Sequence, residues 1–384
     1  MEVIEVNSKK TIKDFQKVPW KIYKNDKNWI PHLKQDIEKV FDPTKNKAHR
    51  TGKIIRWILI DNNKEVLGRI VAFISNVKSK KRAGGIGFFE CINNQDAANL
   101  LFETAKKWLY KYNIEHIDGP INFGEKHLFW GLLVDNFVDP NSYGMNYNPP
   151  YYRGLFESFG FEIYYKQFMY KREMAMPVQD VFTRKHAFLM KDPDYRIENV
   201  RKLSLEEIGI NFQTVYNSAW AVHKGFEAMH LKTAHAIMKN LKPVYDPDIM
   251  VFVYHKNKPI AFYINIPELN EIFKYVNGNL NWIGKIKFLY HKWKKTPRTM
   301  VGIVFGVAKE YQGTGAEGAL IKWSEKHIVS KNNYDQTVLA WIGDFNPTML
   351  HVCENLGANV YRTYHTYRYL FDRNKKFERL PILK

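Results

Sequence analysis

The stretch "VGIVFGVAKEYQGTGAEGALIKW", residues 301–323, decides the fold of the second half of the chain. An apolar run over 299–307 predicts a buried strand, and the apolar spacing of 317–329 predicts a helix. Between them lies a loop that contains Gly313 and Gly315. The first N–H groups of a helix lack partners within the helix and carry partial positive charge. Because glycines let a ligand approach closely, this loop can bind an anionic group.

Two interpretations of this loop compete. In the first, Gly313, Gly315 and Gly318 open the helix N-terminus to a pyrophosphate. In the second, Thr314 is the N-cap of a capping box, in which its hydroxyl accepts the N–H of Glu317 and the Glu317 carboxylate accepts the N–H of Thr314. A carboxylate about 4 Å from a phosphate costs on the order of 4 kcal/mol before screening, so the second arrangement opposes binding. The sequence leaves both open.

The composition is that of a folded and strongly basic protein. The chain has 384 residues, of which 45% are apolar and 15% aromatic, enough for well-packed cores. Its 58 Lys and Arg residues against 39 Asp and Glu residues give a net charge of +19. Such a charge attracts polyanions, including nucleic acid, anionic lipid and phosphate-bearing cofactors. The sequence has no clear nucleic-acid-binding motif.

The sequence favours the cytoplasm as the location of the protein. There is no run of about 18 uncharged apolar residues, and the N-terminus lacks the apolar region of a signal peptide. We therefore expect no integral membrane segment. Cys91 and Cys353 lie in different halves, so a disulfide framework is not expected. Cysteine and histidine do not occur at zinc-binding spacing, and we expect no metal site.

A long internal repeat predicts a duplicated domain. The segments "FESFGFEIYYKQFMYKR" and "CENLGANVYRTYHTYRY" align without gaps at an offset of 197 residues, with Gly160 opposite Gly357. Each glycine follows a predicted helix and precedes a predicted strand, which is typical of a left-handed C-cap. The same order of elements precedes both segments: hairpins at 54–74 and 248–266, buried strands at 84–91 and 299–307, and helices at 96–112 and 317–329. The sequence predicts two α/β (α+β) domains, 1–175 and 176–384, each a mixed central sheet flanked by helices.

The second half resembles the GNAT superfamily, the Gcn5-related N-acetyltransferases. In that family a central strand leads into a loop of the pattern Gln/Arg-x-x-Gly-x-Gly/Ala, which opens a helix and grips the pyrophosphate of acetyl-CoA. Gln312 and Gly315 match the first two positions, whereas Glu317 stands at the third. The segment "DFNPTMLHVCENLG" supplies Asn346 and a closing Glu-x-x-Gly at the family's spacing. The first half resembles a degenerate copy without the glycine loop, and the whole chain is similar to bacterial tandem GNAT-like proteins.

This resemblance implies an acyl-CoA-dependent N-acyltransferase, most simply an N-acetyltransferase using acetyl-CoA, that acts on an amine. Backbone N–H groups of the central strand would polarise the thioester carbonyl. The residues implied to bind the cofactor are Phe305, Val307, Gln312, Gly313, Thr314, Gly315, Ala316, Glu317, Gly318 and Asn346.

Two of the three candidate catalytic residues, Cys353 and Glu310, have a plainer structural alternative. Cys353 stands where the family has a tyrosine that protonates the departing CoA thiolate, but it can equally be a small buried apolar side chain. Asp344 and Glu310 lie at predicted strand ends as candidate bases, although Glu310 also suits a solvated loop. Asn346 can bind the cofactor, as the resemblance implies, or act simply as a helix N-cap. His223 can line the acceptor groove or lie on the surface.

Two other functions remain open from the sequence. One is a non-catalytic GNAT-fold binding module whose loop is closed by Thr314 and Glu317. The other is a tandem-GNAT aminoacyl transferase that uses charged tRNA, to which the net charge is suited.

A basic apolar segment at 281–298 also remains open to interpretation. Trp282, Ile286, Leu289 and Trp293 recur at helical spacing among lysines. The segment can contact an anionic membrane surface, face the phosphates of a cofactor, or be a solvated basic face.

Overall fold

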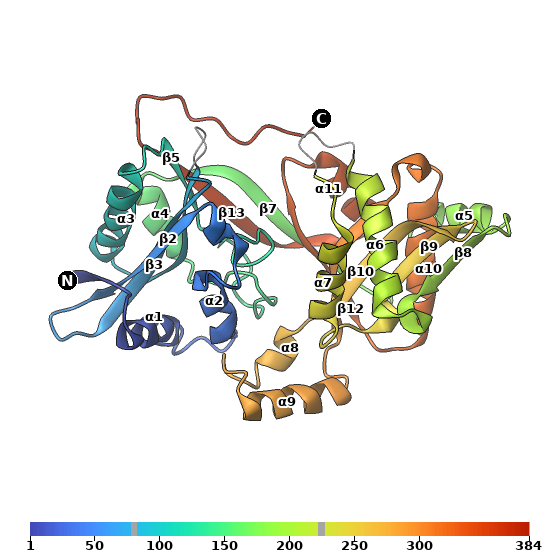
Figure 1. Cartoon of the computed structure of the whole chain (residues 1–384), viewed down its shortest axis with the longest axis horizontal. Helices are drawn as coiled ribbons and strands as arrows, with labels where there is room; N and C mark the ends of the chain where they lie inside the picture. Colours follow the sequence, from blue (N-terminus) through green and yellow to red (C-terminus); the bar gives the residue numbers. More distant parts are fainter. Residues whose placement is uncertain (78–82, 222–226, 384) are drawn as a thin grey trace.

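One continuous mixed sheet runs through the whole molecule, with helices on both of its faces (Figure 1). The computed structural model describes residues 1–77, 83–221 and 227–383, and within them thirteen strands belong to this sheet. The strands are β1 (Glu2–Glu5), β2 (Lys53–Ile60), β3 (Val66–Ser75), β4 (Ala83–Cys91), β5 (His116–Gly119), β6 (Leu132–Leu133), β7 (Glu162–Glu173), β8 (Tyr195–Asn199), β9 (Met250–His255), β10 (Lys258–Pro267), β11 (Thr299–Val307), β12 (Gln336–Gly343) and β13 (Asn359–Leu370).

The helices pack against the two faces of the sheet. They are α1 (Lys9–Ile22), α2 (Lys34–Phe41), α3 (Gln95–Tyr110), α4 (Tyr152–Phe159), α5 (Asp180–Leu189), α6 (Leu205–Trp220), α7 (Leu231–Leu241), α8 (Asn270–Phe273), α9 (Trp282–Trp293), α10 (Ala316–Ser330) and α11 (Pro347–Asn355), with short 3-10 helices η1 (Lys47–Arg50), η2 (Val200–Lys202), η3 (Pro247–Ile249) and η4 (Lys309–Tyr311). Side chains alternate between faces along a strand. In β10, Phe262 packs with α6 and α7, whereas its neighbour Tyr263 packs on the α10 side.

The predicted α/β fold class and the repeated order of elements are confirmed. Each half has an antiparallel hairpin, a buried strand, a helix and a strand that pairs in parallel with the buried one. α4 ends at Gly160 with φ of 104°, and Gly357 follows α11 with φ of 68°. Both glycines therefore adopt the left-handed conformation that the repeat required, at equivalent places in the two halves.

The final strands of the two halves are exchanged. β7, from the first half, pairs with β12 of the second half, with Glu173 opposite Gln336. β13, from the second half, pairs with β5 of the first half, with Tyr367 opposite Gly119, and β13 and β7 pair with each other. The strand order is β1-β2-β3-β4-β5-β13-β7-β12-β11-β10-β9-β8, with β6 beside β13. The division at residue 175 stays a prediction, because both halves contribute strands to the middle of one sheet.

Candidate active site

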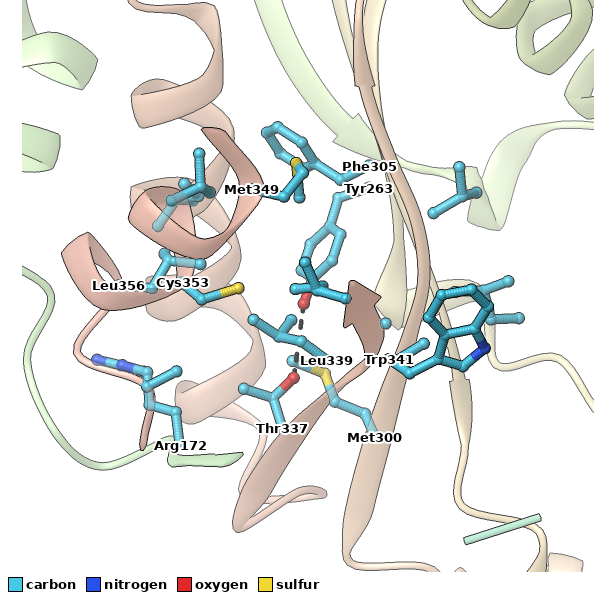
Figure 2. A pocket seen from close by; sticks show the side chains of 18 of the residues that line it. Arg172, Tyr263, Met300, Phe305, Thr337, Leu339, Trp341, Met349, Cys353 and Leu356 are labelled. Carbon is cyan, nitrogen blue, oxygen red and sulfur yellow. Dashed lines mark hydrogen bonds between the residues drawn. The ribbon is translucent and has the colours of Figure 1, made fainter. Parts of the chain in front are cut away.

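The central strands of the second half diverge and open a cavity. β11 and β12 pair in parallel only from Thr299 opposite Gln336 to Gly302 opposite Leu339. Both strands continue beyond that point, β11 to Val307, so their edges separate. A cavity of about 400 Å³ occupies the opening (Figure 2). This volume lies within the range of roughly 300–1,000 Å³ that is typical of small-molecule sites.

The cavity connects the two faces of the sheet. Tyr263 and Phe305 belong to the cluster of side chains under α10. Val304 and Trp220 belong to the cluster under α6 and α7, on the opposite face. All four residues line the same cavity. The wall of the cavity at the gap between β11 and β12 is therefore built from both faces of the sheet.

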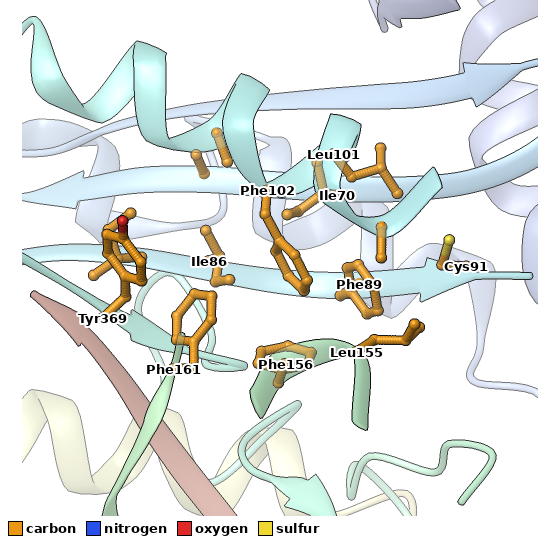
Figure 3. Close-up of a cluster of buried hydrophobic side chains, with 14 of the residues drawn as sticks. Ile70, Ile86, Phe89, Cys91, Leu101, Phe102, Leu155, Phe156, Phe161 and Tyr369 are labelled. Atoms are coloured by element: carbon orange, nitrogen blue, oxygen red, sulfur yellow. The ribbon is translucent and has the colours of Figure 1, made fainter. Parts of the chain in front are cut away.

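Most of the cavity wall is apolar, and the wall is built by the sheet, α10, α11 and the segment after β7. Its apolar residues include Met174, Val178, Met300, Ile303, Ile321, Leu339, Ala340, Trp341, Ile342, Met349, Val352, Leu356 and Ala358. The equivalent space in the first half is filled by aromatic rings (Figure 3). Phe156, which aligns with Cys353, is fully buried there, and Phe89 stacks on Phe102 with ring centroids 4.7 Å apart. The cavity thus lies among elements of the second half, and Arg172 of β7 and Met174 just after it complete the wall.

The capping box predicted for Thr314 and Glu317 is wrong. Gly315, not Thr314, is the N-cap of α10; its φ is 96°, and no side chain among the described residues caps the helix. The Thr314 hydroxyl donates instead to the Tyr311 carbonyl at 2.7 Å. The Glu317 carboxylate accepts a hydrogen bond from Lys185 Nζ at 2.8 Å. The second interpretation of the loop, in which Thr314 and Glu317 fill the helix N-terminus, is therefore wrong.

Lys185 of α5 lies across the glycine loop. A Cβ placed on Gly318 would come within 2.6 Å of the Lys185 side chain, and one on Gly315 within 3.5 Å. Gly313 has φ of 77°, and an added Cβ there would meet no described atom within 4 Å. Lys185 also balances the negative charge of Glu317. The open backbone at Gly313, an uncapped helix N-terminus and the nearby Lys185 ammonium group fit the pyrophosphate of acyl-CoA.

Of the other predicted cofactor-binding residues, some line the cavity and some lie away from it. Phe305 and Asn346 line the cavity. The Asn346 side chain also accepts the N–H of the third residue of α11 at 3.3 Å, so it is that helix's N-cap. Gln312 donates to the Val307 carbonyl at 3.2 Å and closes the loop on itself. Val307 and Ala316 are buried in the core between the sheet and α10.

Of the three predicted catalytic residues, Cys353 lines the cavity. It is fully buried, and burial raises the pKa of its thiol to about 12. Asp344 lies just beyond β12 and pairs with Arg379 of the C-terminal segment. Glu310 lies on η4 and accepts a hydrogen bond from Lys258 at 2.9 Å, which lowers its pKa to about 2. Glu310 is not among the described residues that line the cavity, and such a carboxylate is a weak base, so Cys353 is the better-placed site residue.

The sequence did not reveal two residues of the site. Tyr263 projects into the cavity, with its hydroxyl 3.5 Å from the Thr337 hydroxyl (Figure 2), and burial raises its pKa to about 12. Alternation along β10 could have placed Tyr263 on this face, but not beside a cavity. No local sequence pattern indicates a role for Lys185, because it lies 132 residues before its partner Glu317. His223 lies outside the described residues.

These features define a protein with two GNAT-fold halves. Among solved structures, a tandem GNAT protein from the clavulanic acid biosynthesis pathway aligns with 96% of this chain and 98% of its own, at a TM-score of 0.55 and 9% identity. The predicted GNAT resemblance is confirmed at the level of fold. No known family model matches the chain. Among the described helices, none is both long and apolar enough to cross a membrane.

Two curated proteins are similar in sequence along nearly their whole lengths. The bacterial ceramide synthase of Caulobacter vibrioides is 24% identical over 377 residues, which cover 96% of this chain and 97% of that protein. Protein YghO of Escherichia coli is 26% identical over 377 residues, which cover 94% of this chain and 93% of that protein.

Proposed function

We propose that this protein is an N-acyltransferase that moves an acyl group from acyl-CoA to an amine. The observation that carries the proposal is the cavity through the sheet at the diverging strands, in the half that also holds the open glycine loop. The GNAT fold of the structural neighbour supports acyl transfer as the reaction class.

The chain's own residues have separate roles in this proposal. Gly313, Gly315 and Lys185 would hold the pyrophosphate, and the diverging edge of β11 would offer backbone N–H groups to a carbonyl oxygen. Acyl-CoA, when bound, supplies the activated thioester. Cys353 and Tyr263 stay protonated near neutral pH and can donate hydrogen bonds inside the cavity. The apolar wall excludes water, which protects an activated acyl group from hydrolysis.

We further propose that the acyl group is a long hydrocarbon chain rather than acetyl. The apolar residues that line the cavity, among them Leu339, Met174 and Val178, support this substrate class. The name of the Caulobacter relative, a ceramide synthase, supports a lipid product. Each buried methylene contributes about 0.8 kcal/mol, a factor of roughly four in affinity, so a long chain should bind far more tightly than acetyl.

Calorimetric binding tests both parts of the proposal. Wild-type protein should bind long-chain acyl-CoA more tightly than acetyl-CoA. Cys353→Phe places in the cavity the ring that Phe156 places in the first half, and it should weaken long-chain binding roughly tenfold or more. Cys353→Ser keeps the cavity volume and serves as the control. If wild type binds neither compound at millimolar concentration, the proposal fails; if it prefers acetyl-CoA, only the substrate class fails.

The two alternatives have weaker support. The non-catalytic module depended on a capping box that Thr314 and Glu317 do not form. The tRNA-dependent transferase rests on net charge alone.

A further inference from the structure

α9 is attached to the rest of the protein by one face. Its N-cap is Asn281, whose side chain accepts the N–H of Gly284 at 3.0 Å. Gly284 and Phe288, four residues apart, are its buried positions. Phe288 stacks on Phe273 of α8, with ring centroids 5.8 Å apart. α9 lies at the lower edge of the molecule in Figure 1. The helix is therefore firmly placed, with its other side turned away from the core.

The outward face of α9 is apolar. Trp282, Ile286, Leu289 and Trp293 recur at spacings of four, three and four, which places them on one face of a helix. Their exposed fractions are 71%, 58%, 63% and 78%. At 3.6 residues per turn this face is opposite the buried one, so it does not serve the protein's own core. A contiguous apolar surface of this kind marks an interaction site.

Lysines border this apolar face on both sides. Within 281–295 there are five lysines and no acidic residue. Lys287 and Lys292 reach back to backbone carbonyls of the protein at 3.1 Å and 2.6 Å. Lys285 and Lys294 are exposed on opposite flanks of the apolar face. A tryptophan stands at each end of the helix, where amphipathic rings suit the boundary between lipid and water.

We propose that the outward face of α9 docks on an anionic lipid surface. The tryptophans and aliphatic side chains would enter the headgroup boundary, while the lysines contact lipid phosphates. A second copy of the chain is a poorer occupant, because pairing two such faces would bring the flanking Lys285 and Lys294 of each copy together. The proposal does not depend on acyl transfer, since it rests on the surface of α9 alone.

Vesicle co-sedimentation of the full chain tests this docking. Vesicles of phosphatidylcholine with about 30% phosphatidylglycerol should bind the protein at about 0.05 M NaCl, and roughly tenfold more weakly at about 0.5 M NaCl or with phosphatidylcholine alone. Trp282→Ser with Trp293→Ser should reduce binding roughly tenfold. The control pair is Tyr110→Ser with Val138→Ser, which replaces side chains 69% and 75% exposed elsewhere.

A charge-matched pair separates α9 from the general basicity of the protein. Lys285→Glu with Lys294→Glu should reduce binding roughly tenfold, whereas Lys107→Glu with Lys111→Glu on and after α3 should have little effect. The proposal is overturned by absence of vesicle binding at low salt, or by equal losses in the α9 and control pairs. It is also overturned if sedimentation velocity shows that the α9 tryptophans support self-association while vesicle binding survives their replacement.

Discussion

At the scale of single residues, the pairing of Glu317 with Lys185 changes how the glycine loop before α10 is interpreted. Glu317 is a carboxylate where the GNAT pattern has a small residue. In the capping-box interpretation this carboxylate opposes the binding of a pyrophosphate. The structure brings Lys185 from α5 to 2.8 Å from that carboxylate. A pairing across 132 residues has no local signature, because α5 and α10 meet only in the folded chain.

The ion pair gives a testable prediction. Lys185→Ala should weaken acyl-CoA binding several-fold, about 1 kcal/mol, because it leaves Glu317 unpaired beside the loop and removes a nearby cation. Calorimetry at low salt measures the change. Lys185→Ala with Glu317→Ala should recover part of the affinity. Equal affinity in wild type and both variants would show that neither charge acts on the loop.

The two cysteines give a second prediction at this scale. Cys91 and Cys353 are both fully buried, and burial raises the pKa of each thiol to about 12. The thiolate is the reactive form, so the folded protein should resist a thiol reagent at pH 8. In denaturant the same reagent should modify both thiols. Rapid modification of the native protein would contradict the described burial.

At the scale of elements, local patterns predicted most strands and some of the helices, but not the partners of the strands. Apolar periodicity located the two hairpins, the buried strands and the helices after them, and the glycine repeat located both helix ends. Strand exchange could not be predicted, because β7 and β13 carry similar sequences and either would suit either place. The cavity could not be predicted from the sequence either, because it depends on the residue at which the pairing of β11 and β12 stops.

Removing β13 tests the exchange. A chain that ends after Ala358 should lose the first-half core, because Tyr367 and Tyr369 of β13 pack against α3 and α4. Near-ultraviolet circular dichroism and gel filtration should report an expanded, loosely packed protein. A chain that ends after Arg373 keeps β13 and is the control. A compact first half in the shorter chain would contradict the exchange.

At the scale of the whole molecule, a buried carboxylate joins the two halves. Glu268 accepts the N–H of Tyr143 from the first half at 2.8 Å and that of Asn270 at 2.9 Å. It is 7% exposed, and burial raises its pKa to about 7. The carboxyl therefore titrates near neutral pH in the folded protein but at more acidic pH in the unfolded chain.

This carboxyl predicts a pH dependence of stability. Between about pH 4.5 and 7 the unfolded chain has lost the proton that the folded protein retains, so the free energy of unfolding falls by up to about 3 kcal/mol as pH rises, then levels off. His32 and His365 act oppositely, because burial lowers their pKa to about 4. Urea denaturation of Glu268→Gln at pH 5 and 7.5 isolates the carboxyl. Identical pH slopes in wild type and variant would refute the assignment.

The exchange of final strands also delays the folding of the first half during synthesis. The first half cannot complete its sheet until β13 has been synthesised, because β13 pairs with β5. From the end of β5 to the end of β13 the ribosome adds 251 residues, which takes roughly 12–50 s at about 5–20 residues per second. During that interval the edge of β5 that later pairs with β13 remains unpaired. Ribosome-bound chains should therefore present this edge to chaperones until β13 has been synthesised.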